Sequence, residues 1–368
     1  MKTPYNPEKN LVTLSNTLLK HYGIAPSHPV ITSLSKRLIK HTKIACLLFD
    51  GMGKAMVDHH LEPQAFLNHH RFDTITSTFP STTAAATNAF LSGKYPGEIG
   101  WLGWSQYFKE HDRLIELFTG QDYFSQTPFI DPTKLRESLP YVSIFEQIQV
   151  KHPTLHVAQV WPAIRPEGAK TLDEFEAQID AQLSREAVLL YGYWLDPDKS
   201  IHTQGVHHSN ITMIIQNIDG MMARLHEKHP DTLFIVFADH GLVDVQFTPI
   251  NEHADFYACL ERSFALEPRA AAFYVKPEKK QDFERLFETY YGKQFTLVPR
   301  DKVKAHHLYG EGSYHPRFDD FVGDYVAMSH GPLSFSHGVP IGQKPLNFVA
   351  HHAGIHPDEM LIQLFVIG

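Results

Sequence analysis

The sequence lacks three features that would assign it to a restricted class of protein. It has only two cysteines in 368 residues, Cys46 and Cys259, which gives no disulfide framework and favours a reducing compartment. No apolar run approaches the roughly 18 residues that cross a bilayer, and the first residues contain no apolar core of a signal peptide. Basic residues are not in excess, because 33 Lys and Arg face 41 Asp and Glu. We therefore expect a cytoplasmic protein that binds neither membranes nor nucleic-acid polymers.

The composition that remains is that of a folded protein with one unusual feature. Hydrophobic residues make up 43% of the chain and charged residues 20%, which excludes a disordered or fibrous protein. The chain contains 25 histidines, some of them in adjacent pairs. Histidine is the commonest metal ligand, so this number favours a metal site, although many of the histidines will lie on the surface.

Strand-length apolar runs alternate with helical patterns along most of the chain. We predict strands near 44–49, 154–160, 187–195, 231–238 and 360–367, and helices near 83–92, 141–150, 172–186 and 208–228. This alternation is typical of an α/β fold with a mainly parallel central sheet flanked by helices. Residues 245–335 do not continue this alternation of strands and helices. Their pattern predicts a short strand, an amphipathic helix and a loop rich in Tyr, His and Gly. We interpret 245–335 as an inserted α+β cap subdomain, and 1–244 with 336–368 as the core.

Two of the predicted strands end in an acidic residue. Asp50 follows the run at 44–49, and Asp239 follows the run at 231–238 and precedes His240 and Gly241. In open α/β sheets functional groups gather at the carboxyl ends of the strands. Turn chemistry alone can explain an Asp-Gly pair, but an acid next to an imidazole is a more specific metal-ligand arrangement.

A third acidic cluster follows the run at 187–195. Asp198 and His202 are four residues apart, so both can face one ion from a first helical turn. Asp196 is the nearby alternative to Asp198. A solvated turn, in which Asp198 caps the next helix, explains the same pattern equally well.

Hydroxyl-bearing residues lie at the start of the helix predicted near 83–92. The sequence Pro80-Ser81-Thr82-Thr83 leads into a run of alanines, which indicates a loop that enters a helix. A hydroxyl at such a position usually serves only as a cap. The same position suits a nucleophile that attacks phosphorus, because backbone N–H groups and the helix dipole favour an anionic group there.

Three histidines, His351, His352 and His356, precede the last predicted strand and complete an ordered set of motifs. The set is LLFDGMG (47–53), TFPSTTAAATNAFLSGKYPGEIG (78–100), DPDKSIH (196–202), FADHG (237–241) and HHAGIHPDEM (351–360). It resembles the alkaline phosphatase superfamily and, within it, the nucleotide pyrophosphatase/phosphodiesterase group. The motifs extend over nearly the whole chain in the order of that family.

The resemblance implies a site for two divalent metal ions, zinc or alternatively manganese. Asp50, Thr83, Asp239 and His240 match the ligands of one ion, and Asp198, His202 and His352 match those of the other. Thr83 matches the nucleophile of the family, with Thr82 as the alternative if the register differs by one residue. For the last histidine, His351 and His337 are the alternatives to His352.

The implied activity is hydrolysis of a small-molecule phosphodiester or pyrophosphate through a covalent phosphothreonine. Phosphomonoester hydrolysis, phosphonate hydrolysis and a non-catalytic metal-binding protein are the alternatives. The chain departs from the family at 99–104 (IGWLGW), where many members have a phosphate-binding asparagine and this chain has Trp104. Trp104 and Tyr107 are candidates for substrate binding, although aromatic clusters more often form a core. The sequence does not indicate an oligomeric state.

Overall fold

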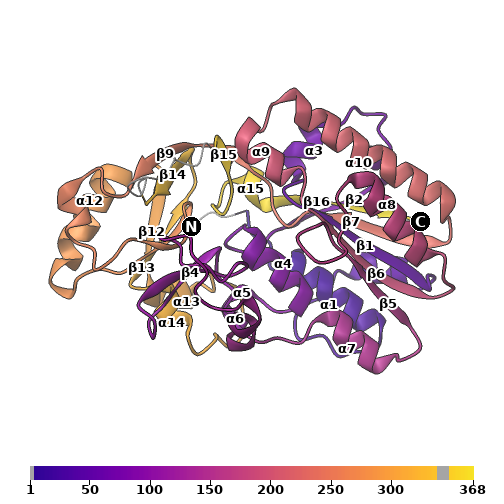
Figure 1. Cartoon of the computed structure of the whole chain (residues 1–368), viewed down its shortest axis with the longest axis horizontal. Helices are drawn as coiled ribbons and strands as arrows, with labels where there is room; N and C mark the ends of the chain where they lie inside the picture. The colour runs from indigo at the N-terminus through magenta and orange to yellow at the C-terminus, as the bar shows by residue number, and fades with distance from the viewer. Residues whose placement is uncertain (1–3, 338–347) are drawn as a thin grey trace.

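A computed structural model describes residues 4–337 and 348–368 of the chain and contains two large sheets (Figure 1). The first sheet has six strands in the order β2-β16-β7-β1-β6-β5. These strands are β2 (Arg71–Thr76), β16 (Leu361–Ile367), β7 (Thr232–Phe237), β1 (Lys43–Phe49), β6 (Val188–Trp194) and β5 (His156–Val160). Only β16 runs antiparallel to its neighbours, which confirms the expected α/β fold with a mainly parallel sheet.

The central strands of this sheet are apolar along their whole length because helices cover both faces. Strands β1, β6 and β7 are almost completely buried. One group of helices consists of α1 (Leu11–His21), α2 (Thr32–Leu38), α4 (Thr83–Ser92) and α7 (Ile144–Lys151). The other consists of α3 (Lys54–His60), α8 (Leu172–Leu183), α9 (Asp198–Gln204) and α10 (Ser209–Lys228). Figure 1 shows α1, α4 and α7 on the opposite side of the sheet from α3, α8, α9 and α10, and α2 packs on α1.

The second large sheet has the strand order β12-β13-β11-β10-β3-β4. Its strands are β12 (Phe295–Pro299), β13 (Tyr325–Ser329), β11 (Ala270–Phe273), β10 (Ala265–Glu267), β3 (Ser105–Phe108) and β4 (Arg113–Glu116). Four of these strands come from the segment 245–335. The other two, β3 and β4, come from residues 105–116, so this sheet extends beyond the segment that the sequence pattern sets apart. The sheet packs with α13 (Arg300–Ala305) and α14 (Phe318–Val322), and it shares a hydrophobic cluster with α12 (Lys280–Tyr291).

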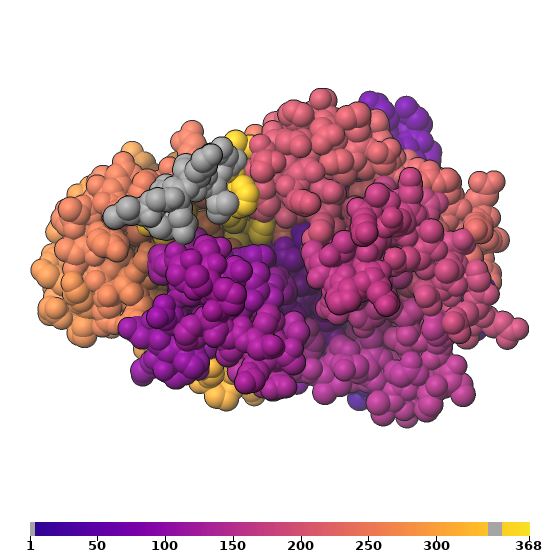
Figure 2. Space-filling view, in the orientation of Figure 1, coloured from indigo at the N-terminus to yellow at the C-terminus, as the bar shows by residue number. Residues whose placement is uncertain are grey.

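Short elements connect the two parts of the molecule. Two small pairs are formed by β14 (Leu333–Ser336) with β9 (Gln246–Pro249) and by β15 (Ala350–His351) with β8 (Val243–Asp244). The short helices are α5 (Pro96–Ile99), α6 (Pro132–Ser138), α11 (Ala254–Tyr257), α15 (Pro357–Met360), η1 (Leu67–His70) and η2 (Pro277–Lys279). The space-filling view shows that one face is hollowed where the two parts meet (Figure 2). Within the described ranges, no helix has the length and apolarity that a membrane span requires.

Candidate metal and catalytic site

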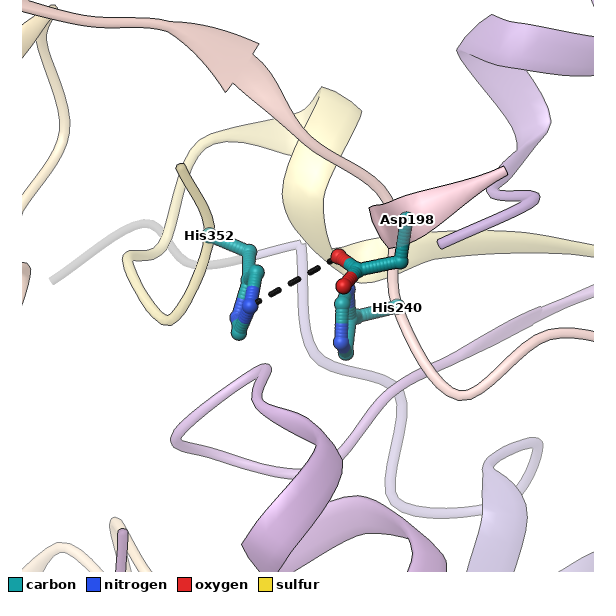
Figure 3. A group of neighbouring side chains, drawn as sticks. All are labelled: Asp198, His240 and His352. Carbon is teal, nitrogen blue, oxygen red and sulfur yellow. Dashed lines mark ion pairs between the residues drawn. The ribbon is translucent and has the colours of Figure 1, made fainter. Parts of the chain in front are cut away.

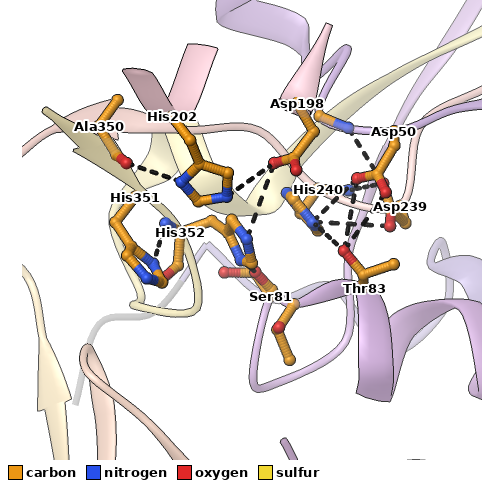
Figure 4. A network of polar contacts seen from close by, with 12 residues as sticks. Asp50, Ser81, Thr83, Asp198, His202, Asp239, His240, Ala350, His351 and His352 are labelled. Carbon is orange, nitrogen blue, oxygen red and sulfur yellow. Dashed lines mark hydrogen bonds and ion pairs between the residues drawn. The ribbon is translucent and has the colours of Figure 1, made fainter. Parts of the chain in front are cut away.

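The carboxyl ends of three adjacent parallel strands carry the acidic residues of the site. Asp50 follows β1, Asp198 begins α9 after β6, and Asp239 follows β7. The strands end level with one another, since Phe49 pairs with Trp194 and Leu48 pairs with Phe237. The backbone N–H of Asp198 donates to the carbonyl of Asp50 at 2.9 Å. The sheet therefore gathers the three carboxylates at one edge, where Figure 4 shows them side by side.

A glycine allows two of these strand ends to approach each other. Gly51 has a positive φ of 72°, which other residues rarely adopt. A Cβ atom at this position would lie 2.8 Å from the Cβ of Asp198. The Asp-Gly pair after β1 is therefore required by the close packing of the Asp50 and Asp198 loops.

The first ligand group consists of Asp50, Asp239 and His240. Their ligand atoms all lie within 4.8 Å of one another, and all three residues are buried. The Nε2 atom of His240 is 3.3 Å from Oδ1 of Asp50 and 3.6 Å from Oδ2 of Asp239. The Tyr193 hydroxyl, at the end of β6, donates to Oδ2 of Asp50 and fixes the orientation of that carboxylate.

The second ligand group is centred on Asp198. Asp198, His240 and His352 have ligand atoms within 4.8 Å of one another (Figure 3). Oδ1 of Asp198 lies 3.7 Å from Nε2 of His352 and 3.4 Å from Nε2 of His202, which is one helical turn further along α9. His240 contributes to both groups, so the two groups form one continuous cluster.

Backbone carbonyls orient the three histidine rings. Nδ1 of His202 bonds to the carbonyl of Ala350 at 2.9 Å, and Nδ1 of His240 bonds to that of Gly241 at 3.1 Å. Nδ1 of His352 bonds to the carbonyl of Ser81 at 3.2 Å. A carbonyl partner places the proton on Nδ1 and leaves Nε2 as an acceptor facing the carboxylates. This arrangement is typical of metal-ligating histidines.

The electrostatics of the cluster show an excess of negative charge that the protein does not balance. Burial raises the pKa of Asp50 well above its ordinary value, and the neighbouring Asp239 and Asp198 raise it further. Burial also raises the pKa of Asp239. For Asp198 burial acts in the same direction and is the largest single cause, but the neighbouring histidines, His202 foremost, together outweigh it and lower the pKa. Oδ1 of Asp198 and Oδ2 of Asp239 are buried without a hydrogen-bond partner among the described residues.

The donor set fits divalent metal ions. Buried, unpartnered carboxylate oxygens and neutral imidazole Nε2 atoms converge on the same space, and a cation there would satisfy both. Oxygen and nitrogen donors without a thiolate suit zinc and also admit manganese.

Thr83 and Thr82 have different surroundings. Thr83 is the first residue of α4, and its Oγ1 lies 3.1 Å from Nε2 of His240 and 3.4 Å from both carboxylate oxygens of Asp50. Thr82 is the N-cap residue of α4 but does not cap the helix with its side chain. Its hydroxyl instead donates to Oε1 of Glu267 at 2.7 Å. The structure thus brings Thr83, and not Thr82, into contact with the first ligand group.

The alternative ligands lie in other environments. Nδ1 of His351 accepts a hydrogen bond from the backbone N–H of His352, and burial lowers the pKa of His351 to about 3. His337 stacks on Phe264 of the cap with ring centroids 3.8 Å apart. The carboxylate of Asp196 accepts from the hydroxyl of Ser200. None of the three alternatives belongs to the ligand groups found among the residues that the structure places.

The two aromatic candidates differ in their relation to the site. Trp104 is 37% exposed, and its backbone N–H donates to Oε1 of Glu267 at 2.6 Å, the atom that Thr82 also contacts. Tyr107, in β3, is buried; its hydroxyl donates to Asp112, and the guanidinium of the cap residue Arg262 lies 4.0 Å from the centre of its ring. Tyr107 therefore packs against the cap, whereas the Trp104 backbone contacts Glu267, the partner of Thr82.

Sequence reasoning missed two groups near the site. Tyr193 supports Asp50, and its position one residue before the end of β6 was the available signal. Glu267 supports Thr82, and burial raises its pKa to about 7. No local pattern distinguishes Glu267 from the other acidic residues of the chain.

A buried ion pair connects the cap with the loop that carries His352. Arg269 and Glu359 are both completely buried, and two hydrogen bonds of 2.7 Å join them. Oε1 of Glu359 also accepts from the backbone N–H of Gly354 at 2.8 Å, two residues after His352. The acidic residue of the HHAGIHPDEM motif therefore has a supporting role.

Comparisons with known proteins agree with this geometry. Residues 44–338 match the family model of type I phosphodiesterase / nucleotide pyrophosphatase. Human ectonucleotide pyrophosphatase/phosphodiesterase 5 has a similar structure, with a TM-score of 0.63, 14% identity, and 89% of this chain and 88% of that chain covered. The murine protein, in an inactive threonine-to-alanine variant in complex with AMP, gives a TM-score of 0.62 and 14% identity, with 88% and 87% covered. No curated protein sequence matches this chain.

The family match extends over well more than half of the chain and includes the segments that carry Asp50, Thr83, Asp198 and Asp239. The structural matches, at 14% identity, show the shared fold. The chain therefore belongs to the type I phosphodiesterase/nucleotide pyrophosphatase family and is a hydrolase that acts on phosphoester bonds.

Proposed function

We propose that the protein is a metal-dependent hydrolase of phosphodiesters or nucleotide pyrophosphates that uses Thr83 as a covalent nucleophile. One observation carries the proposal. The Thr83 hydroxyl lies at the N-terminus of α4, 3.1 Å from His240 and 3.4 Å from Asp50, which belong to the first ligand group. A nucleophile, a cluster of metal-ligand residues and a helix N-terminus that favours anions therefore meet at one point.

Two divalent ions, most simply zinc, would be held by the ligand groups together with Thr83 and His202, which border them. Asp50, Asp239, His240 and Thr83 would hold one, and Asp198, His202 and His352 would hold the other. When bound, such ions lower the pKa of a hydroxyl and stabilise the charge that develops on phosphoryl oxygens. The unpartnered buried oxygens of Asp198 and Asp239 support this assignment.

The reaction would then proceed as two successive displacements at phosphorus, in which residues of the chain have separate roles. Thr83 Oγ1 forms a bond to phosphorus while the bond to the leaving oxygen breaks, and the leaving group departs as an alcohol or phosphate. The first turn of α4 directs its N–H groups toward the phosphoryl oxygens, since the side chain of Thr82 does not cap it. Water then cleaves the Thr83–phosphorus ester and restores the hydroxyl.

We propose a small-molecule substrate, with the cap segment 245–335 and the Trp104 loop selecting its leaving group. The similar murine structure contains AMP, which is consistent with a nucleotide-related substrate. A cytoplasmic location is part of the same proposal, and the free, buried Cys46 and Cys259 are compatible with a reducing compartment.

The test compares Thr83→Ala with Thr82→Ala in zinc-loaded protein, with bis-nitrophenyl phosphate as substrate. We expect Thr83→Ala to lose at least about a thousandfold in kcat, because the covalent step requires its hydroxyl. Thr82→Ala should retain most of the activity. Bound zinc and the melting temperature are measured for both variants, so that a folding defect is recognised. Equal activity in the two variants would refute the assignment of Thr83.

A further inference from the structure

Glu267 is a buried carboxylate at the boundary between the cap and the candidate site. It ends β10 and is 2% exposed. Its Oε1 accepts from the hydroxyl of Thr82 at 2.7 Å and from the backbone N–H of Trp104 at 2.6 Å. Both donors are neutral, and no Lys or Arg in the described part of the chain forms an ion pair with this carboxylate. Its negative charge is therefore left uncompensated beside the N-terminus of α4.

The backbone next to Glu267 is in a conformation that is energetically unfavourable. Leu266, the residue before it, has a φ of 72°, which is unfavourable for a residue with a branched side chain. The loop before β3 approaches closely on the other side, since a Cβ atom on Gly103 would lie 3.0 Å from Cα of Leu266. Strained residues of this kind persist where the surrounding structure fixes them, and they occur often at functional sites.

The carboxylate of Glu267 lies close to the candidate nucleophile. It accepts from the hydroxyl of Thr82, the residue directly before Thr83. The Thr83 hydroxyl in turn lies 3.1 Å from Nε2 of His240 in the first ligand group. A phosphoryl group attacked by Thr83 would therefore lie within the field of this carboxylate.

We propose that Glu267 determines specificity by disfavouring dianionic phosphomonoesters relative to monoanionic phosphodiesters. This inference rests on the proposed function of the site. The repulsion from a fixed negative charge grows with the charge of the phosphoryl group. A monoester carries nearly two negative charges at neutral or higher pH, whereas a diester carries one. The metal ions and the N-terminus of α4 would attract both substrates. The charge of Glu267 would weaken the binding of the monoester more than that of the diester.

The test measures kcat/KM for nitrophenyl phosphate and for bis-nitrophenyl phosphate in zinc-loaded Glu267→Gln. The assay is run at about pH 9, where a carboxyl with a pKa of about 7 is ionised in the wild type. The glutamine keeps an acceptor oxygen for Thr82 and Trp104 and removes only the charge. We expect the monoester-to-diester ratio of kcat/KM to rise by roughly ten- to a hundredfold.

Two further variants separate charge from structure. Glu267→Asp keeps the charge and should leave the ratio within about threefold of the wild type. Glu116→Gln is the matched control, because Glu116 ends β4 in the same sheet and is also a buried carboxylate that accepts from a threonine hydroxyl, that of Thr119. It should not change the ratio.

The outcomes of this test are distinguishable from a failure of the proposed function. If the wild type hydrolyses the diester and the ratio in Glu267→Gln stays unchanged, or rises equally in Glu116→Gln, the inference about Glu267 is wrong. If the zinc-loaded wild type hydrolyses neither ester, the proposed function itself is wrong. A loss of activity toward both esters in equal proportion would assign Glu267 a positioning role and would also overturn the inference.

Discussion

Replacing Asp239 by Asn should stabilise the metal-free protein and destroy the metal site at the same time. Oδ1 of Asp239 accepts from the backbone N–H of Gly51 at 3.2 Å and from that of His240 at 3.1 Å, and asparagine keeps this acceptor. Oδ2 has no partner among the described residues. The substitution therefore preserves the local hydrogen bonds and removes one negative charge from the cluster.

The expected magnitude follows from the geometry of the first ligand group. Ligand atoms of Asp50 and Asp239 lie within 4.8 Å, and two full charges 4.8 Å apart repel by about 3 kcal/mol at an effective dielectric constant of 20. Asp50 relieves part of this repulsion by taking up a proton, so the stabilisation that removing one charge brings is smaller than the repulsion between two full charges. We expect metal-free Asp239→Asn to be more stable than metal-free wild type by about 1 to 3 kcal/mol.

The pH dependence has a defined sign. The pKa values of Asp50 and Asp239 are raised in the folded protein, so the folded state binds more protons than the unfolded state. The free energy of unfolding of the metal-free protein should therefore fall as pH rises above the ordinary carboxyl value of about 4. The fall should be shallower in Asp239→Asn, because one of the two carboxyls is absent.

Thermal and denaturant unfolding with and without zinc provide the assay. At a zinc concentration a thousand times the dissociation constant, the free energy of unfolding of the wild type should rise by about 4 kcal/mol, and that of the variant should rise much less. Zinc should therefore reverse the order of stability: Asp239→Asn is the more stable protein without metal, and the wild type is the more stable protein with it. A metal-free variant less stable than the wild type, or an equal gain from zinc in both proteins, would refute this account of the cluster.

Three further substitutions test the surroundings of the site. His352→Ala should lose one of two bound ions by metal analysis, whereas His337→Ala should keep both; the opposite result would exchange their roles. Tyr193→Phe should weaken zinc binding by roughly ten- to a hundredfold in a competition titration, because the donor that orients Asp50 is lost. An unchanged zinc affinity would show that Tyr193 does not support the metal site. Arg269→Leu should lower the free energy of unfolding by about 3 to 5 kcal/mol, since it leaves Glu359 buried and unpaired. Adding Glu359→Leu should restore part of this loss, and no restoration would contradict the ion-pair explanation.

The fold of the core could be predicted from the sequence because its strands are buried on both faces. Continuous apolar runs identify β1, β6, β7 and β16. The strand β2 was not recognised, since it lies at the sheet edge and four of its six residues are polar. The pairing of β3 with β10, through Ser105 and Leu266, joins residues far apart in sequence, and no local periodicity encodes it.

The candidate site was predictable to the extent that its residues follow strands. Asp50, Asp198 and Asp239 stand at the ends of neighbouring parallel strands, so the topology of the sheet brings them together. Glu267 reaches the site from the second sheet through a long-range contact with Thr82. Such a contact depends on how the cap packs on the core, which a single sequence does not reveal.

Zinc titration of the metal-stripped protein tests the central claim most directly, with bound metal and hydrolysis of bis-nitrophenyl phosphate followed in the same samples. The account predicts no hydrolysis without metal, two ions bound per chain at saturation, and activity that appears as the second ion binds. Full activity in the stripped protein, or two bound ions without any hydrolysis of the diester, would contradict it.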